Sequence, residues 1–134
     1  MDLLGGTCET DLKKQLEAYF GYSCFREGQE EIIRSVLSGR DTLAVMPTGS
    51  GKSICYQLPA LMMNGICIVV SPLIALMKDQ VETLNRKGIA ATCLNHLLNP
   101  REQALIVEGL KTGRYRCVYV APERFRSVQF INLL

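Results

Sequence analysis

A glycine-bearing loop between two apolar runs is the feature that most constrains how this chain can fold. It reads Met46-Pro47-Thr48-Gly49-Ser50-Gly51-Lys52-Ser53. Residues 41–46 before it, which end in the apolar run Leu43-Ala44-Val45-Met46, predict a buried strand. Residues 54–63 after it predict a packed helix, which Pro59 must kink or end. A strand, a tight turn and a helix in this order are typical of a phosphate-binding loop.

The residue types in the loop suit the binding of a triphosphate. Gly49 and Gly51 lack a Cβ atom, so backbone N–H groups can turn inward beside the positive end of the following helix. Lys52 is placed to reach the β and γ phosphates, and the Ser53 hydroxyl to complete the shell of a Mg²⁺ ion. Met46 stands where the strict pattern has a glycine, so the loop is a relaxed form. The alternative is a glycine-rich turn with an incidental lysine.

Composition bounds the class of protein. The 134 residues suffice for one domain, and 48% hydrophobic with 21% charged residues are values of an ordinary globular chain. There is no membrane-length apolar run and no secretory signal, so we expect a cytosolic or nuclear protein. A net charge of +2 is too small to indicate nucleic-acid binding by itself. The six cysteines are far apart, with only His96 to assist, so we expect free thiols and no zinc site.

Strands and helices alternate along the rest of the chain. Two amphipathic helices, the first over residues 10–20 and the second ending at Gly39, precede the loop. Further strands are predicted over residues 65–71, 89–94 and 116–121, and further helices from Pro72 to Gly88 and from Pro100 to Gly113. This order predicts a parallel sheet between layers of helices, with ligands at the carboxyl ends of its strands. We expect the sheet core to contain Leu43, Val45, Val69 and Val118.

The connector between the first two helices holds candidates for base recognition. The amide of Gln29 can pair with N6 and N7 of adenine, donating one hydrogen bond and accepting another. Tyr22 and Arg26 could stack on the two faces of that base. Without further context, the more usual interpretation is that Tyr22 is a core aromatic residue and that the other two are solvated residues at a helix start.

Four groups of motifs occur together and in a fixed order. They are Phe20-Gly21-Tyr22 with Phe25-Arg26 and Gly28-Gln29; residues 46–53 followed by Cys55-Tyr56-Gln57-Leu58-Pro59-Ala60; residues 70–80, which begin Val70-Ser71-Pro72-Leu73; and Tyr119-Val120-Ala121-Pro122-Glu123-Arg124-Phe125. With these motifs the chain closely resembles the RecQ family of superfamily 2 DNA helicases from about residue 20 to residue 125. The resemblance implies ATP-driven unwinding of duplex DNA by translocation in the 3′ to 5′ direction.

The resemblance also implies a fold and a set of site residues. The fold is α/β: a P-loop NTPase, RecA-like three-layer sandwich with a parallel sheet, incomplete and preceded by two N-terminal helices. Residues 1–40 would hold the adenine-recognition helices, and residues 41–134 part of the RecA-like core. The implied ATP contacts are Tyr22, Arg26, Gln29, Pro47, Thr48, Gly49, Ser50, Gly51, Lys52 and Ser53. Lys52 and Ser53 would be catalytic, and Ser53 would also bind Mg²⁺. The implied contacts to DNA are Ser71, Pro72, Leu73, Asp79, Gln80, Pro122 and Glu123.

One motif of the family has no counterpart among the 134 residues. This is the Asp-Glu-x-His box, whose acidic residues hold Mg²⁺ and orient the attacking water. We therefore expect this chain alone to bind nucleotide but neither to hydrolyse ATP at a useful rate nor to unwind DNA. The expected partners are single-stranded and duplex DNA and no membrane, in the bacterial nucleoid or the eukaryotic nucleus. The alternatives are a small P-loop kinase or other phosphotransferase, with Glu123 as the acidic metal partner, and a non-catalytic nucleotide-binding module.

Overall fold

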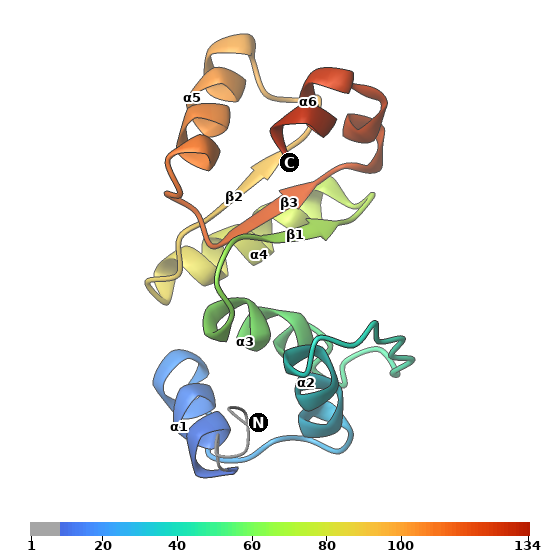
Figure 1. Cartoon of the computed structure of the whole chain (residues 1–134), viewed down its shortest axis with the longest axis vertical. Helices are drawn as coiled ribbons and strands as arrows, with labels where there is room; N and C mark the ends of the chain where they lie inside the picture. The colour runs from blue at the N-terminus through green and yellow to red at the C-terminus, as the bar shows by residue number, and fades with distance from the viewer. Residues whose placement is uncertain (1–8) are drawn as a thin grey trace, which may run out of the picture. The chain divides into compact units, whose positions relative to one another are not determined.

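The computed structural model describes residues 9–134, and their contacts divide the chain into two compact units (Figure 1). The first unit ends at Met63, and the second runs from Asn64 to Leu134. The predicted boundary near residue 40 falls inside the first unit, between its helices. We describe each unit by itself.

The first unit consists of three helices, α1 (Glu9–Phe20), α2 (Gln29–Leu37) and α3 (Ile54–Met62). Leu12, Leu16 and Phe20 recur at intervals of four residues on α1 and are buried, as expected for the apolar stripe of an amphipathic helix. Gly21 ends α1 with φ 75°, and its N–H donates to the Glu17 carbonyl over 2.9 Å. Helices α2 and α3 pack against each other and bury Ile33 and Leu58 completely.

The strand predicted over residues 41–46 does not form, and that prediction is wrong for this structure. The segment has no regular secondary structure, and Leu43 and Val45 are 92% and 90% exposed instead of buried in a sheet. An apolar strand without alternation needs paired neighbours and cover on both faces. No strand within residues 9–134 pairs with this segment. A pattern of apolar residues indicates that a segment favours the strand conformation, but it does not show whether another strand is available to pair with it.

The second unit is a small α/β sandwich built on a three-stranded parallel sheet. Its elements are β1 (Cys67–Val70), α4 (Ile74–Arg86), β2 (Ala91–Leu94), α5 (Pro100–Lys111), β3 (Cys117–Val120), the 3-10 helix η1 (Pro122–Arg126) and α6 (Val128–Leu133). The strand order is β1-β3-β2, and both pairs are parallel. Cys117 is in register with Cys67 and with Ala91, so the three strands end at one level. The predicted alternation and parallel sheet are confirmed for this part of the chain.

The core of the second unit is centred on β3, all four residues of which are buried. On one face of the sheet, Val118, Val120 and Leu94 cluster with Phe130 of α6, and Ile106 and Leu110 of α5 pack against them. Successive residues of a strand point to opposite faces. Cys117 and Tyr119 therefore face the other layer, where α4 lies against the sheet and buries Met77 and Leu84 (Figure 1).

Several helix boundaries differ from those predicted. Helix α4 begins at Ile74 instead of Pro72, because Leu73 is extended (φ −96°, ψ 91°) and its N–H donates to the Ser71 hydroxyl over 3.3 Å. Helix α3 continues three residues past Pro59 to Met62, so the proline does not end it. Helix α5 begins at Pro100 as predicted, after a reciprocal capping box between Asn99 and Glu102.

The described cysteines, Cys24, Cys55, Cys67, Cys93 and Cys117, are all free thiols, and Cys8 lies outside the described residues. Within residues 9–134 no cluster of three or more histidine, cysteine or acidic side chains could hold a metal ion. None of the helices in the same range has the length and apolar character needed to cross a bilayer.

Candidate nucleotide and nucleic-acid sites

The phosphate loop forms the tight turn that its glycines predict. Gly49 and Gly51 have φ 79° and 82°, backbone conformations that residues with a Cβ rarely adopt. Within the turn, the Ser50 N–H donates to the Pro47 carbonyl over 3.2 Å. The chain then enters α3 directly, so the loop is held at the N-terminal end of a helix, where backbone N–H groups and the helix dipole attract anions.

Lys52 and Ser53 stand at the end of this loop with their functional groups available. Lys52 is exposed, and Ser53 is the N-cap residue of α3 but makes no side-chain capping hydrogen bond. In the part of the chain that the structure describes, neither the Lys52 ammonium nor the Ser53 hydroxyl is tied to another side chain. An adjacent ammonium and hydroxyl are the groups that a phosphate and its metal ion require.

Gln29 is brought to the phosphate loop, although 22 residues separate it from Gly51. Its side chain is 2% exposed, and both ends of its amide are used. The Arg26 N–H donates to Gln29 Oε1 over 2.8 Å, and Gln29 Nε2 donates to the Gly51 carbonyl over 3.0 Å. A primary amide has two acceptor and two donor positions, so one of each remains. These are the two that the adenine edge needs.

A cavity of about 310 Å³ lies between the connector and the phosphate loop, at the small end of the range for ligand sites. Its lining residues are Gly21, Tyr22, Ser23, Cys24, Arg26, Gln29, Gly51 and Ile54. Tyr22 is 50% exposed and is therefore not the core aromatic residue of the alternative interpretation. Arg26 donates from Nη1 to the Gly49 carbonyl over 2.8 Å, which adds a second hydrogen bond to the loop beside that of Gln29.

Sequence reasoning missed some of these contacts. Ser23, Cys24 and Ile54 also line the cavity. In the sequence, only their positions next to Tyr22 and Ser53 could have indicated that they belong to the site. The two bonds to the carbonyls of Gly49 and Gly51 carry no signal at all, because every residue type has a backbone carbonyl.

Cys55 lies behind the phosphate loop, with its Sγ atom 3.8 Å from Met46 Sδ and 4.0 Å from the Gly51 carbonyl. Burial raises the pKa of the Cys55 thiol above its ordinary value. The thiol therefore remains neutral at neutral pH and adds no negative charge beside the loop.

In the second unit, several predicted DNA contacts meet at the carboxyl ends of β1 and β3. The Ser71 N–H donates to the Val120 carbonyl over 3.1 Å, which brings Ser71 beside the start of Pro122-Glu123. Pro72, Leu73, Pro122 and Glu123 are exposed there. Asp79 and Gln80 lie farther along, inside α4. The helix N-terminus expected at Pro72 is at Ile74 instead, so Ser71, Pro72 and Leu73 form an extended loop before it.

Comparison with known sequences agrees with the motifs. The sequence model of the DEAD/DEAH box helicase family matches residues 26–133. The chain is 52% identical over 120 residues to the ATP-dependent DNA helicase RecQ of Bacillus subtilis, and 46% identical over 119 residues to that of Haemophilus influenzae. Each alignment covers 89% of this chain but only 20% and 19% of the respective relative. The similarity to RecQ helicases that the motifs predicted is confirmed.

A solved structure shares the fold. It is the crystal structure of a hypothetical ATP-dependent RNA helicase from Sulfolobus tokodaii, with a TM-score of 0.67 and 18% sequence identity. The match covers 95% of this chain and 38% of the other. At this identity the likeness concerns the fold alone, and it supports a partial RecA-like α/β fold. Because the family match extends over residues 26–133 of a chain of 134, the protein belongs to the DEAD/DEAH box helicase family.

Proposed function

We propose that this chain is the ATP-binding part of an ATP-dependent DNA helicase similar to RecQ. One observation carries the proposal: Gln29 is bonded to the phosphate loop through Gly51 and still has one donor and one acceptor free. The relatives bear the name ATP-dependent DNA helicase, which supports the choice of nucleotide and of polymer. The chain spans about a fifth of their length, so unwinding of duplex DNA belongs to the proposal for the longer protein.

In this proposal, different residues of the chain contact the base, the phosphates and the metal ion. Gln29 pairs with the adenine edge, and Tyr22 packs against the ring from the wall of the cavity. The N–H groups of residues 47–53 surround the phosphates, and Lys52 contacts the β and γ oxygens. The Ser53 hydroxyl, which makes no capping hydrogen bond, is suited to be a ligand of Mg²⁺. This ion would offset phosphate charge when bound with the nucleotide.

We further propose that this chain binds ATP without efficient turnover. Phosphoryl transfer requires a positioned water and stabilisation of developing charge in addition to phosphate binding. The sequence holds no Asp-Glu-x-His box to provide them. Glu123, the acidic residue of the phosphotransferase alternative, is exposed in η1 and does not end β3, so no observation favours that function.

For DNA, we propose that a single strand passes the carboxyl ends of β1 and β3. Ser71, Pro72 and Leu73 would contact its backbone from one strand end, and Pro122 and Glu123 from the next, with Asp79 and Gln80 on α4 as further contacts. Contacts of this kind bind phosphate and sugar without reading sequence, which suits a protein that moves along DNA.

Nucleotide binding tests the proposal directly. A fluorescent ATP analogue is titrated into the wild-type chain and into Lys52→Ala, with Lys14→Ala on the exposed surface of α1 as the matched control. Loss of a charged hydrogen bond predicts about tenfold weaker binding or more for Lys52→Ala and no change for the control. Gln29→Ala should reduce the preference for ATP over GTP. Unchanged affinity in Lys52→Ala would refute the proposed site, and rapid ATP turnover by this chain would refute the proposed inactivity.

A further inference from the structure

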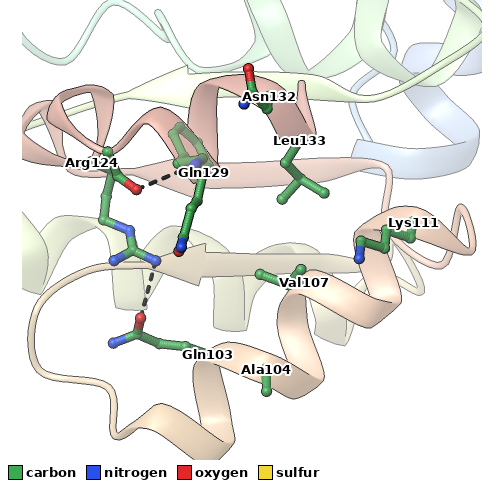
Figure 2. A pocket seen from close by; sticks show the side chains of 10 residues that line it. Gln103, Ala104, Val107, Lys111, Arg124, Gln129, Asn132 and Leu133 are labelled. Carbon is green, nitrogen blue, oxygen red and sulfur yellow. Dashed lines mark hydrogen bonds between the residues drawn. The ribbon is translucent and has the colours of Figure 1, made fainter.

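A second cavity, of about 640 Å³, lies within the second unit between α5 and the pair η1 and α6 (Figure 2). Its volume is in the usual range for a ligand-binding pocket. None of the residues assigned above to nucleotide or DNA lines it. The cavity therefore needs an explanation of its own.

Arg124 is the main polar group of this cavity. Its Nη2 atom donates to Gln103 Oε1 over 3.2 Å, and its guanidinium carbon lies 5.9 Å from the centre of the Phe130 ring. The Nε atom is buried and has no hydrogen-bond partner within residues 9–134. Buried donors are seldom left unpaired in native proteins. The hydrogen bond to Gln103 and the contact with the Phe130 ring thus hold the guanidinium in place. Most of its N–H donors form no hydrogen bond with the residues that the structure describes.

The rest of the lining combines a second positive charge with uncharged polar side chains and apolar side chains. Lys111, in the last turn of α5, lies at the other end of the cavity from Arg124 (Figure 2). Val107 and Leu133 lie between them on the facing helices. Among the residues that the structure describes, no aspartate or glutamate lines the cavity. Its charge is therefore positive at both ends and uncompensated.

We propose that this cavity binds an acidic peptide segment of a partner protein, whose carboxylates pair with Arg124 and Lys111. A carboxylate matches the flat, forked donors of a guanidinium and can accept two of them at once. The apolar side chains of the same peptide would contact Val107 and Leu133. A peptide is favoured over a nucleic acid because Val107 and Leu133 are aliphatic and suit leucine or phenylalanine side chains beside the carboxylates, whereas nucleic-acid bases bind by stacking on flat aromatic side chains.

The test uses a short fluorescein-labelled peptide that alternates aspartate with leucine and phenylalanine, and a second peptide with asparagine in place of each aspartate. Fluorescence anisotropy measures their binding to the wild-type chain and its variants. We expect Arg124→Gln to weaken binding of the acidic peptide about tenfold, and Lys111→Gln about threefold because Lys111 is exposed. The matched control is Arg101→Gln, an exposed change on the same helix outside the cavity lining, which should change affinity less than twofold.

A further variant separates loss of binding from loss of structure. Lys111→Glu replaces an exposed side chain and leaves Arg124 with its bond to Gln103, so the fold should persist by circular dichroism. It should weaken the acidic peptide more than Lys111→Gln does and leave the asparagine peptide unaffected. Equal affinity of the wild-type chain for both peptides, or no binding of either, would overturn the proposal. So would displacement of the acidic peptide by single-stranded DNA together with weaker DNA binding in Lys111→Glu.

Discussion

Replacing Gly51 with alanine tests whether the contact between the phosphate loop and Gln29 matters. Gly51 has φ 82°, and a Cβ built on it would collide with Gln29 Nε2. The left-handed backbone conformation alone costs about 1–2 kcal/mol for a residue with a side chain. Displacing the Gln29 amide leaves a buried donor unpaired, which costs about 1–3 kcal/mol more. We therefore expect Gly51→Ala to destabilise the first unit by about 2–5 kcal/mol.

Two other glycines provide matched controls. Gly39 and Gly49 have φ 77° and 79°, almost the same strain, but a Cβ at either would meet no atom of the described residues within 4 Å. Gly39→Ala should therefore cost only the strain, about 1–2 kcal/mol, and leave ATP affinity unchanged. Gly49→Ala should cost the same and should affect ATP binding only through the shape of the loop.

Hydrogen–deuterium exchange provides the stability measurement, because it reports on the first unit alone. Peptides covering α2 and α3 should lose protection in Gly51→Ala more than in Gly39→Ala, and the difference in opening free energy should be about 1–3 kcal/mol. The ATP:GTP affinity ratio should fall in Gly51→Ala only. Equal protection in the two variants, with an unchanged ratio, would show that the Gln29 contact contributes nothing.

Three further predictions concern exposure and packing. Leu43→Lys should change the free energy of unfolding by less than about 0.5 kcal/mol in urea titrations, because the side chain is 92% exposed; a larger loss would mean that it is buried. Phe130→Ala should cost about 3–5 kcal/mol in the same assay, and Phe125→Ala, an exposed partner whose ring centre lies 5.4 Å away, only about 1 kcal/mol. Iodoacetamide should label exposed Cys24 first and buried Cys117 last, because the hydrogen bond to Cys67 and burial raise the pKa of Cys117. Mass spectrometry of the labelled peptides gives the order of labelling, and labelling of Cys117 as fast as that of Cys24 would contradict the prediction.

The sequence was sufficient for the parts of the site that depend on local chemistry. The absence of a Cβ atom permits the positive φ observed at Gly49 and Gly51, whereas the placement of Gln29 with the loop in one nucleotide site was implied by the resemblance to RecQ helicases. The strand predicted over residues 41–46 is absent, and its apolar residues alone could not show this, since strand formation depends on a paired neighbour. The start of α4 was misplaced by two residues because Ser71 bonds to the Leu73 N–H and keeps the intervening chain extended.

The geometry around Gln29 also bears on how base and phosphate recognition are connected. The amide that would read the adenine edge already accepts from the Arg26 N–H and donates to the Gly51 carbonyl. A bound base would use the second lone pair of Oε1 and the second hydrogen of Nε2, so it adds to these bonds and does not replace them. Any movement of Gln29 toward the base would then pull on Gly51, next to Lys52. In the proposed complex the base and the phosphates would therefore be recognised through one connected set of hydrogen bonds, and a displacement at either end would be transmitted to the other.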